Sequence, residues 1–214
     1  MSMKWVNLLT SLGDETLFDA SALLSGADPP SEVHRMLSRW TASGRLIQLR
    51  RGLYVLAPPY ARTPPSPVAI AGRLRRPSYV SLQSALAFHG AIPESVAVTT
   101  SVTTRRPGRW ETRFGDFRYR HVHPDLFWGY RQIDFGEGEA GHVAFAEKAL
   151  LDLFHLTAGP IRADFVRELR LEPEVIDSHR LRELAQRTAR PKLIRAAEVA
   201  DRILEEECLG EVVL

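Results

Sequence analysis

Residues Gly44–Pro58, "GRLIQLRRGLYVLAP", decide the fold of the first part of this chain. Two short apolar runs, each with the composition of a strand, are separated by Arg50, Arg51 and Gly52. Three residues make a hairpin loop in which glycine stands where a type I turn followed by a left-handed residue requires it. The stretch therefore predicts a β-hairpin with a double positive charge at its tip.

A helix is predicted immediately before this hairpin, with Pro30 at its start and Gly44 just past its end. At 100° per residue it has one apolar stripe, formed by Val33, Met36, Leu37 and Trp40. Five polar residues lie on or beside the opposite face: Ser31, His34, Arg35, Ser38 and Arg39. A helix that packs through one stripe and exposes serine and arginine suits the major groove of DNA, where arginine reads guanine. The alternative is an ordinary solvated helix face.

Two further short helices are predicted upstream, in Trp5–Leu12 and in the stretch that begins at Asp19 or Ser21. Three helices followed by a basic hairpin is the order of a winged helix-turn-helix domain. In that fold the third helix enters the major groove and the hairpin, or wing, reaches phosphates beside it. Arg50 and Arg51 are then phosphate contacts; alternatively they belong to a turn that only aids solubility.

Proline marks a domain boundary, because the eleven residues Ala57–Pro67 contain five prolines. This composition excludes a helix or a central strand and favours a stiff, extended linker. We predict a winged helix-turn-helix domain over 1–57, a linker over 58–67 and a second domain over 68–214. The hydrophobic content of 44% is ample for packed cores. The expected class is α+β, with an antiparallel sheet in a mixed α/β second domain.

A second hairpin is predicted in the second domain, within Arg109–Val122. A two-residue turn at Gly115–Asp116 places aromatic residues on the core side and Arg113 opposite Arg118 on the other. Like charges facing each other are destabilising, so such a pair suggests a bound anion. The predicted second basic surface consists of Arg105, Arg106, Arg109, Arg113, Arg118 and Arg120. The alternative is a set of arginines that extend into water.

Three more helices are predicted in the second domain. Ser81–Gly90 ends at a glycine, and Pro191–Glu207 has the pattern of an amphipathic packing helix. Ala144–Leu156, "AFAEKALLDLFHL", has apolar residues around most of its circumference and is expected to be largely buried. Lys148 and Asp152 lie four residues apart in it, which predicts a structural pair.

Charge is distributed unevenly along the chain, although the net charge is only +2. Residues 1–57 carry 6 basic and 5 acidic side chains (+1), residues 58–123 carry 10 and 3 (+7), and residues 124–214 carry 12 and 18 (−6). The basic middle third favours an anionic partner.

The lone Cys208 excludes an internal disulfide, and neither a signal peptide nor a run of about 18 apolar residues is visible. We therefore expect a cytoplasmic protein without a membrane span.

Four stretches, in their order and spacing, resemble the AbiEi family, the antitoxin and transcriptional-repressor component of type IV toxin–antitoxin (abortive phage infection) systems. They are "LIQLRRGLYVLAP" (46–58), "PSYVSLQSALAFHGAIPE" (77–94), "SVTTRRPGRWETRFGDFRYRHV" (101–122) and "AFAEKALLDLFHL" (144–156). The resemblance runs from about Ala20 to Leu156. Ala146 departs from the pattern, which has proline before "EKALLD".

This resemblance implies a winged-helix domain that binds inverted repeats of double-stranded DNA in its own promoter, and a C-terminal antitoxin domain. It also implies a cognate nucleotidyltransferase-like toxin, encoded alongside, with or without physical contact. By position, Ser31, Arg35, Ser38 and Arg39 match the recognition helix, and Arg50 and Arg51 match the wing. Two alternatives stay open: an interaction module that neutralises its toxin by direct binding, and a stand-alone transcriptional regulator.

An enzyme is not expected from these residues. His121 and His123 alternate like two metal ligands on one strand, but no third ligand stands in register. Glu147 and Lys148 are adjacent and point in different directions on a helix. No glycine-rich phosphate loop and no Gly-x-Ser-x-Gly motif is present. We therefore expect no catalytic residue, no metal and no cofactor.

Overall fold

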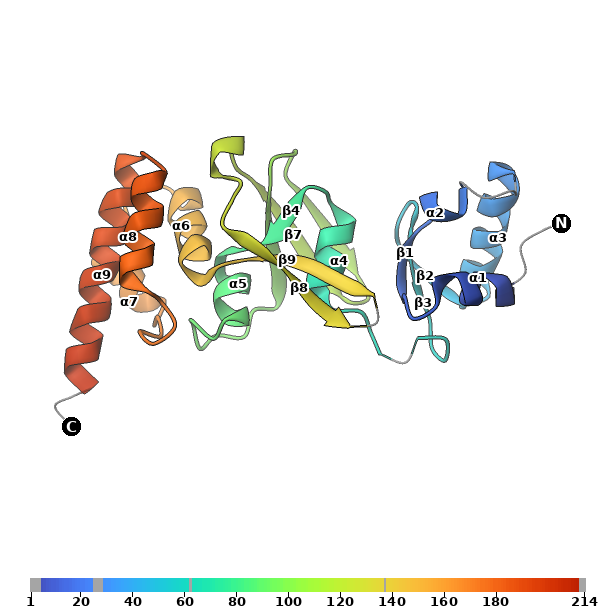
Figure 1. Cartoon of the computed structure of the whole chain (residues 1–214), viewed down its shortest axis with the longest axis horizontal. Helices are drawn as coiled ribbons and strands as arrows, with labels where there is room; N and C mark the ends of the chain where they lie inside the picture. The colour runs from blue at the N-terminus through green and yellow to red at the C-terminus, as the bar shows by residue number, and fades with distance from the viewer. Residues whose placement is uncertain (1–4, 25–28, 62, 137, 212–214) are drawn as a thin grey trace. The chain divides into compact units, whose positions relative to one another are not determined.

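The computed structural model describes residues 5–24, 29–61, 63–136 and 138–211 of the chain (Figure 1). It contains helices, a three-stranded sheet and a six-stranded sheet, which confirms the α+β class. The chain forms two compact units. The first comprises Met1–Arg75 and Ile133–Gly141, and the second comprises Arg76–Gln132 and His142–Leu214.

The first unit begins with three helices and three short strands. In chain order they are α1 (Trp5–Leu12), β1 (Leu17–Asp19), α2 (Ser21–Leu24), α3 (Pro30–Ala42), β2 (Leu46–Arg50) and β3 (Leu53–Leu56). The strands form an antiparallel sheet in the order β1-β3-β2. The hairpin and the helices were expected, but β1 was not, because three residues are too few to show the alternation of a strand.

Helix α3 packs through the apolar stripe that its sequence predicts. Val33, Met36, Leu37 and Trp40 are all buried, with at most 3% of each residue exposed. They share one core with residues of α1 and of the sheet, and α1 and α3 lie against the same face of that sheet (Figure 1). Burying an apolar side chain of this size stabilises a fold by about 1.5–3 kcal/mol, so the stripe alone fixes which face of α3 points outward.

The β2–β3 hairpin differs from its predicted form by one residue. Arg50 ends β2 and pairs with Leu53, and the register shifts between Gln48 and Arg50. The loop therefore consists of Arg51 and Gly52 only, because the irregularity within β2 takes up the extra residue. The predicted requirement for glycine is confirmed, since Gly52 has a φ of +81°.

The described residues of the proline-rich stretch lie in neither helix nor strand up to Ser66, as predicted, but Pro67 begins a helix. The stretch is not a free spacer, because Ala57 is buried and the ring of Tyr60 packs edge-on against Trp5 with centroids 4.8 Å apart. The helix, α4 (Pro67–Leu74), was not predicted, and the Ser66 Oγ accepts a hydrogen bond from its second residue. The first compact unit continues through α4.

A six-stranded sheet follows, in the strand order β6-β7-β5-β4-β9-β8. Its strands are β4 (Ser78–Val80), β5 (Val98–Thr103), β6 (Gly108–Thr112), β7 (Gly115–His121), β8 (Tyr130–Gly136) and β9 (Glu139–Ala144). The expected antiparallel sheet is found only in part: β4 pairs with β5 and β6 with β7 in antiparallel, whereas β5 pairs with β7 and β4 with β9 in parallel, so the sheet is mixed. Strand β7 lies inside the sheet since it carries the buried Phe117 and Tyr119, whereas β6 is half exposed and stays at the edge.

The register of the β6–β7 hairpin also corrects the prediction. The turn is Arg113–Phe114 and not Gly115–Asp116. The hydroxyl of Thr112 closes it, accepting from the amide of the second turn residue and donating to the carbonyl of the residue after it, both at 3.1 Å. As a result Arg118 lies opposite Arg109, while Arg113 belongs to the turn.

Five helices complete the second unit. They are α5 (Leu82–Phe88), α6 (Ala146–Leu156), α7 (Ala163–Glu168), α8 (Ser178–Arg187) and α9 (Pro191–Glu211), with a short 3₁₀ turn η1 (Pro124–Leu126). Helix α6 packs against α5, α8 and α9, and α8 runs beside α9 (Figure 1). The predicted burial of α6 is confirmed from Ala146 through Phe154. Within the described ranges, no helix combines the length and the apolar character that a bilayer crossing requires.

Candidate functional site

The outward face of α3 carries all five side chains that the sequence predicts for DNA contact. These are Ser31, His34, Arg35, Ser38 and Arg39, and each is exposed. In the described part of the chain, none of these side chains forms a hydrogen bond or an ion pair with another residue. A row of exposed hydroxyl and guanidinium groups on a helix held by its opposite face is suited to contact base edges and phosphates.

The two arginines of the hairpin have different surroundings. Arg51 is exposed at the tip. Arg50 is partly buried: its Nη2 donates to the carbonyl oxygen of Arg73 at 3.0 Å and lies 3.5 Å from Oδ1 of Asp19, and its Nη1 donates to the carbonyl of Arg51 at 3.0 Å. The structure therefore separates one solvent-facing arginine from one that is bound to the protein.

Asp19 and Arg73 complete this cluster and were missed from the sequence. Arg73 Nη1 donates to Asp19 Oδ2 at 3.2 Å, so the carboxylate lies between two guanidinium groups. Asp19 ends β1 and Arg73 lies in the last turn of α4. No local pattern predicts this contact, because the partners are 31 and 54 residues apart in the chain.

The predicted second basic surface is less uniformly positive than expected. Arg109 Nη2 lies 3.0 Å from both Glu111 Oε1 and Asp116 Oδ2, so two carboxylates neutralise it. Arg120 is partly buried and donates to the carbonyl of Leu156 at 3.3 Å. The exposed members are Arg105, Arg106, Arg109, Arg113 and Arg118. The β6–β7 turn brings Arg113 to the hairpin end, away from Arg118, so the predicted facing pair is replaced by Arg109 and Arg118.

Of the two histidines predicted on one strand, only His121 lies in a strand, because β7 ends there and His123 caps η1. Each has a local partner. His121 Nδ1 lies 3.1 Å from the carbonyl oxygen of Arg105, and His123 Nδ1 lies 3.1 Å from a carboxylate oxygen of Asp125. Of the side chains that the structure describes, no three or more of His, Cys, Asp and Glu come together as a set of metal ligands would. The geometry therefore supplies no reason to assign these histidines to a metal.

A buried polar network joins β4 and η1 to α6. The ammonium of Lys148 forms an ion pair with Asp152 Oδ1 and donates to the hydroxyl of Tyr79 at 2.9 Å. Asp152 Oδ2 accepts from the Tyr79 hydroxyl at 2.9 Å and from Ser81 Oγ at 2.8 Å. All four residues are at most 1% exposed. The predicted Lys148–Asp152 pair is confirmed. No sequence signal marks its two hydroxyl partners, of which Tyr79 lies in β4 and Ser81 lies between β4 and α5.

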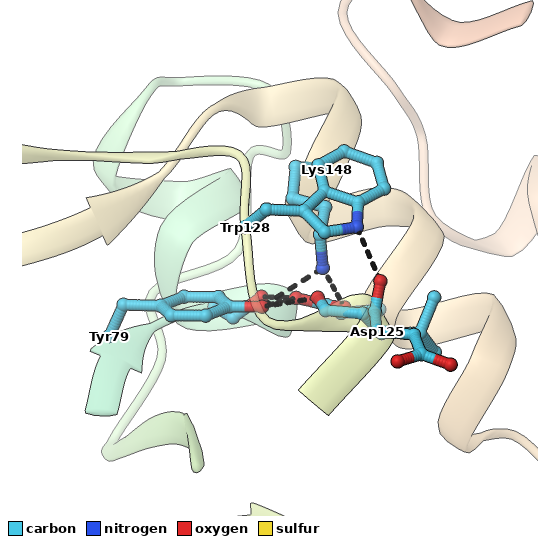
Figure 2. A network of polar contacts seen from close by, with 7 residues as sticks. Tyr79, Asp125, Trp128 and Lys148 are labelled. Atoms are coloured by element: carbon cyan, nitrogen blue, oxygen red, sulfur yellow. Dashed lines mark hydrogen bonds and ion pairs between the residues drawn. The ribbon is translucent and has the colours of Figure 1, made fainter. Parts of the chain in front are cut away.

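The indole ring of Trp128 lies over the ammonium group of this network. Figure 2 shows the Lys148 ammonium directed at the Tyr79 hydroxyl beneath the indole of Trp128, whose ring centroid lies 5.1 Å from Nζ. The Trp128 Nε1 donates to the carbonyl of Asp125 at 2.8 Å, and the guanidinium of Arg187 lies 4.4 Å from the indole centroid. Two basic side chains thus lie close to the indole, and cation–π attraction favours this placement.

Burial governs the titration of the network. Burial raises the pKa of Tyr79, and the neighbouring Asp152 carboxylate raises it further. Burial also lowers the pKa of Lys148 and raises that of Asp152, while the attraction between the two charges opposes both shifts. Both carboxylate oxygens are engaged, so the network is closed. Such an arrangement is suited to hold a strand to a helix, because a buried ion pair is tolerated only when its remaining hydrogen bonds are made.

The two candidate regions therefore differ in kind. The α3 face exposes polar side chains without protein partners, whereas the Lys148 network keeps all of its members inside the second unit. An external ligand can reach the first without a rearrangement of the protein. Comparison with known proteins finds no family model that matches the chain and no significantly similar curated protein.

Proposed function

We propose that the chain is a sequence-specific DNA-binding autorepressor and antitoxin that counteracts a nucleotidyltransferase-like toxin. One observation carries the DNA-binding part: α3 buries its apolar stripe and exposes Ser31, Arg35 and Ser38 on the other side. The element order α1-β1-α2-α3-β2-β3 and the antiparallel sheet support a winged helix-turn-helix domain.

In this proposal α3 lies in the major groove. Arg35 reads a guanine edge, which offers two acceptors to a guanidinium, while the serine hydroxyls and Arg39 bind bases or phosphates. The β2–β3 hairpin is the wing and places positive charge near the phosphates beside the groove. Inverted repeats require two copies of the chain on one operator, each reading one half-site.

The antitoxin part rests on the resemblance to the AbiEi family. A cytoplasmic location follows from it, since both the promoter and the toxin are found there. The basic block of residues 58–123 supports a second contact with an anionic partner, although Arg109 and Arg120 of that block have protein partners.

The DNA-binding part is tested with a duplex from the region upstream of the chain's own gene and a scrambled duplex of equal length. Fluorescence anisotropy over a salt series measures both affinities. Arg35→Ala is expected to reduce the preference for the promoter about tenfold, because one bidentate contact to a base is worth about 1–3 kcal/mol. Arg202→Ala, which removes an exposed arginine from α9, is the matched control. Equal binding of wild type to both duplexes would contradict the proposal.

The antitoxin part is tested by co-expression with the adjacent open reading frame. The chain is expected to relieve growth arrest caused by a nucleotidyltransferase-like neighbour. Co-purification of that neighbour with the tagged chain separates neutralisation by direct binding from neutralisation without contact. A neighbour of another class, without growth arrest, would favour a stand-alone regulator.

A further inference from the structure

The hairpin tip of the first unit is fastened by a cluster that contains Arg50, Asp19 and Arg73. The side chains of the three residues are 35%, 25% and 24% exposed, respectively. Two guanidinium groups share one carboxylate, and the carbonyl of Arg73 accepts a further hydrogen bond from Arg50. The cluster thus joins the end of β2 to the end of β1 and to the last turn of α4.

A backbone hydrogen bond fixes the same tip from the side of β1. The amide of Ala20 donates to the carbonyl of Gly52 at 2.8 Å. Asp19, one residue earlier, pairs with Leu53 in the β1–β3 register. The ion cluster holds Arg50 at the start of the loop and this hydrogen bond holds Gly52 at its end, so loss of the first is expected to loosen the second.

The donors of Arg50 are largely occupied. Three of its N–H groups are directed to Asp19, to the Arg73 carbonyl and to the Arg51 carbonyl. Its Nε is buried without a hydrogen-bond partner among the described residues and has no access to an external anion. A guanidinium has five N–H donors, so only one N–H of Nη1 is left, and a bidentate phosphate contact by Arg50 requires existing bonds to break. Arg51 has no such constraint, since its side chain is exposed.

We propose that Arg50, Asp19 and Arg73 are positioning residues that set the orientation of the wing, and that Arg51 alone is its phosphate contact. This inference rests on the proposed DNA-binding function and refines it. The adjacent arginines are chemically identical, but only one is left to neutralise a phosphate. Asp19 then strengthens DNA binding although it is negatively charged, because it holds the wing in place.

The salt dependence of binding distinguishes contact from positioning. Each neutralised phosphate contributes about 0.9 to the slope of log K against log salt concentration. Arg51→Ala is expected to reduce this slope by about 0.9 on promoter and scrambled DNA alike. Arg50→Ala is expected to weaken binding up to about fivefold, the size of an exposed ion pair, with the slope unchanged.

The variant Asp19→Asn separates two possible roles of the carboxylate, because they predict opposite changes in DNA affinity. If Asp19 positions the wing, its replacement weakens binding about threefold, within the range of a partly exposed ion pair. If Asp19 merely competes with phosphate for Arg50, loss of the carboxylate releases the guanidinium and removes a negative charge, so binding strengthens. The midpoint of urea denaturation, measured for each variant, shows that a change in affinity is not global unfolding.

Hydrogen exchange tests the positioning role without DNA. The Ala20 amide is expected to exchange faster in Arg50→Ala and Asp19→Asn and at the wild-type rate in Arg51→Ala, since only the first two break the cluster. The inference is overturned if Arg50→Ala lowers the salt slope by about 0.9, if Asp19→Asn binds more tightly, or if the Ala20 amide is unaffected. Failure of the wild type to bind DNA overturns the proposed function and this inference together.

Discussion

The hydroxyl of Tyr79 donates a hydrogen bond to Oδ2 of Asp152 at 2.9 Å in the interior of the second unit. This bond joins β4 to α6, two elements that are far apart in the chain. The same carboxylate is the partner of the buried Lys148 ammonium. Since both charges are removed from water, the stability of this region depends on each partner being present.

Loss of one charge of the network is expected to be far more damaging than loss of both. Asp152→Ala leaves the Lys148 charge buried and unpaired, which costs about 3–5 kcal/mol in the free energy of unfolding. The double variant Lys148→Met with Asp152→Leu removes both charges and is expected to lose less than Asp152→Ala alone. Urea denaturation measures all three proteins. If the proposed antitoxin activity is found, a stable Asp152→Ala protein that lacks this activity would instead make the network a functional site.

His155 is expected to contribute to a loss of stability in mild acid. Burial lowers its pKa from the ordinary 6.5, and the positive charges of Arg190, Lys192 and Lys148 lower it further. Below about pH 6.5 the unfolded chain takes up a proton that the folded chain resists, so the free energy of unfolding falls as the pH drops from there toward the folded-state pKa. The contribution is at most about 1.4 kcal/mol per pH unit.

Denaturation of wild type and His155→Gln at about pH 7.5 and pH 5.5 measures this contribution. The variant is expected to lose less stability between the two conditions, because it has no imidazole to protonate. Equal losses in the two proteins would show that other groups cause the acid sensitivity.

Substitution of alanine for two glycines of the first unit is expected to change the stability of the protein in opposite directions. A Cβ at Gly141 lies 2.7 Å from the carbonyl oxygen of Val68 and 2.9 Å from its carbonyl carbon, so Gly141→Ala forces backbone apart and costs about 1–3 kcal/mol. A Cβ at Gly72 has its nearest neighbour at 3.9 Å. Because Gly72 lies within α4, Gly72→Ala is expected to stabilise the protein by about 0.5–1 kcal/mol. Thermal denaturation that ranks them in the reverse order would contradict the packing described for Gly141.

If the chain binds DNA as proposed, the arginines of the β6–β7 hairpin are expected to contribute unequally to the affinity. The double variant Arg113→Glu with Arg118→Glu reverses two exposed charges. It is expected to weaken binding to promoter DNA and to scrambled DNA equally. Arg109→Ala is expected to have a smaller effect per charge, since Glu111 and Asp116 already neutralise that side chain. Anisotropy titrations at several salt concentrations compare the variants. Unchanged affinity in the double variant would show that these arginines only extend into water.

The α3 face could be predicted because its evidence is local. The spacing of Val33, Met36, Leu37 and Trp40 specifies the buried stripe, and the polar face follows from helix geometry. The same holds for the burial of α6, whose apolar residues surround the helix, and for the glycine at position 52. In each case the information lies within a few turns of helix or one loop.

The β6–β7 register could not be predicted in the same way. Glycine at position 115 favoured a turn there, but the hydroxyl of Thr112 closes a turn two residues earlier. The parallel pairing of β5 with β7 also depends on distant contacts, because they decide which strand lies in the interior of the sheet. Strand pairing is decided by contacts between distant segments, and short strands carry too little alternation to specify it.

The sequence by itself determined that a helix with a serine and arginine face precedes a glycine-containing basic hairpin, since both depend on residue spacing and backbone preference. Only the tertiary structure decided that Arg50 and Arg51 have different surroundings. The reason is physical: the charge of Arg50 is balanced by Asp19, 31 residues away, and its hydrogen bonds end on Arg73 of α4. A contact between distant segments forms only when β1, β2 and α4 have packed together.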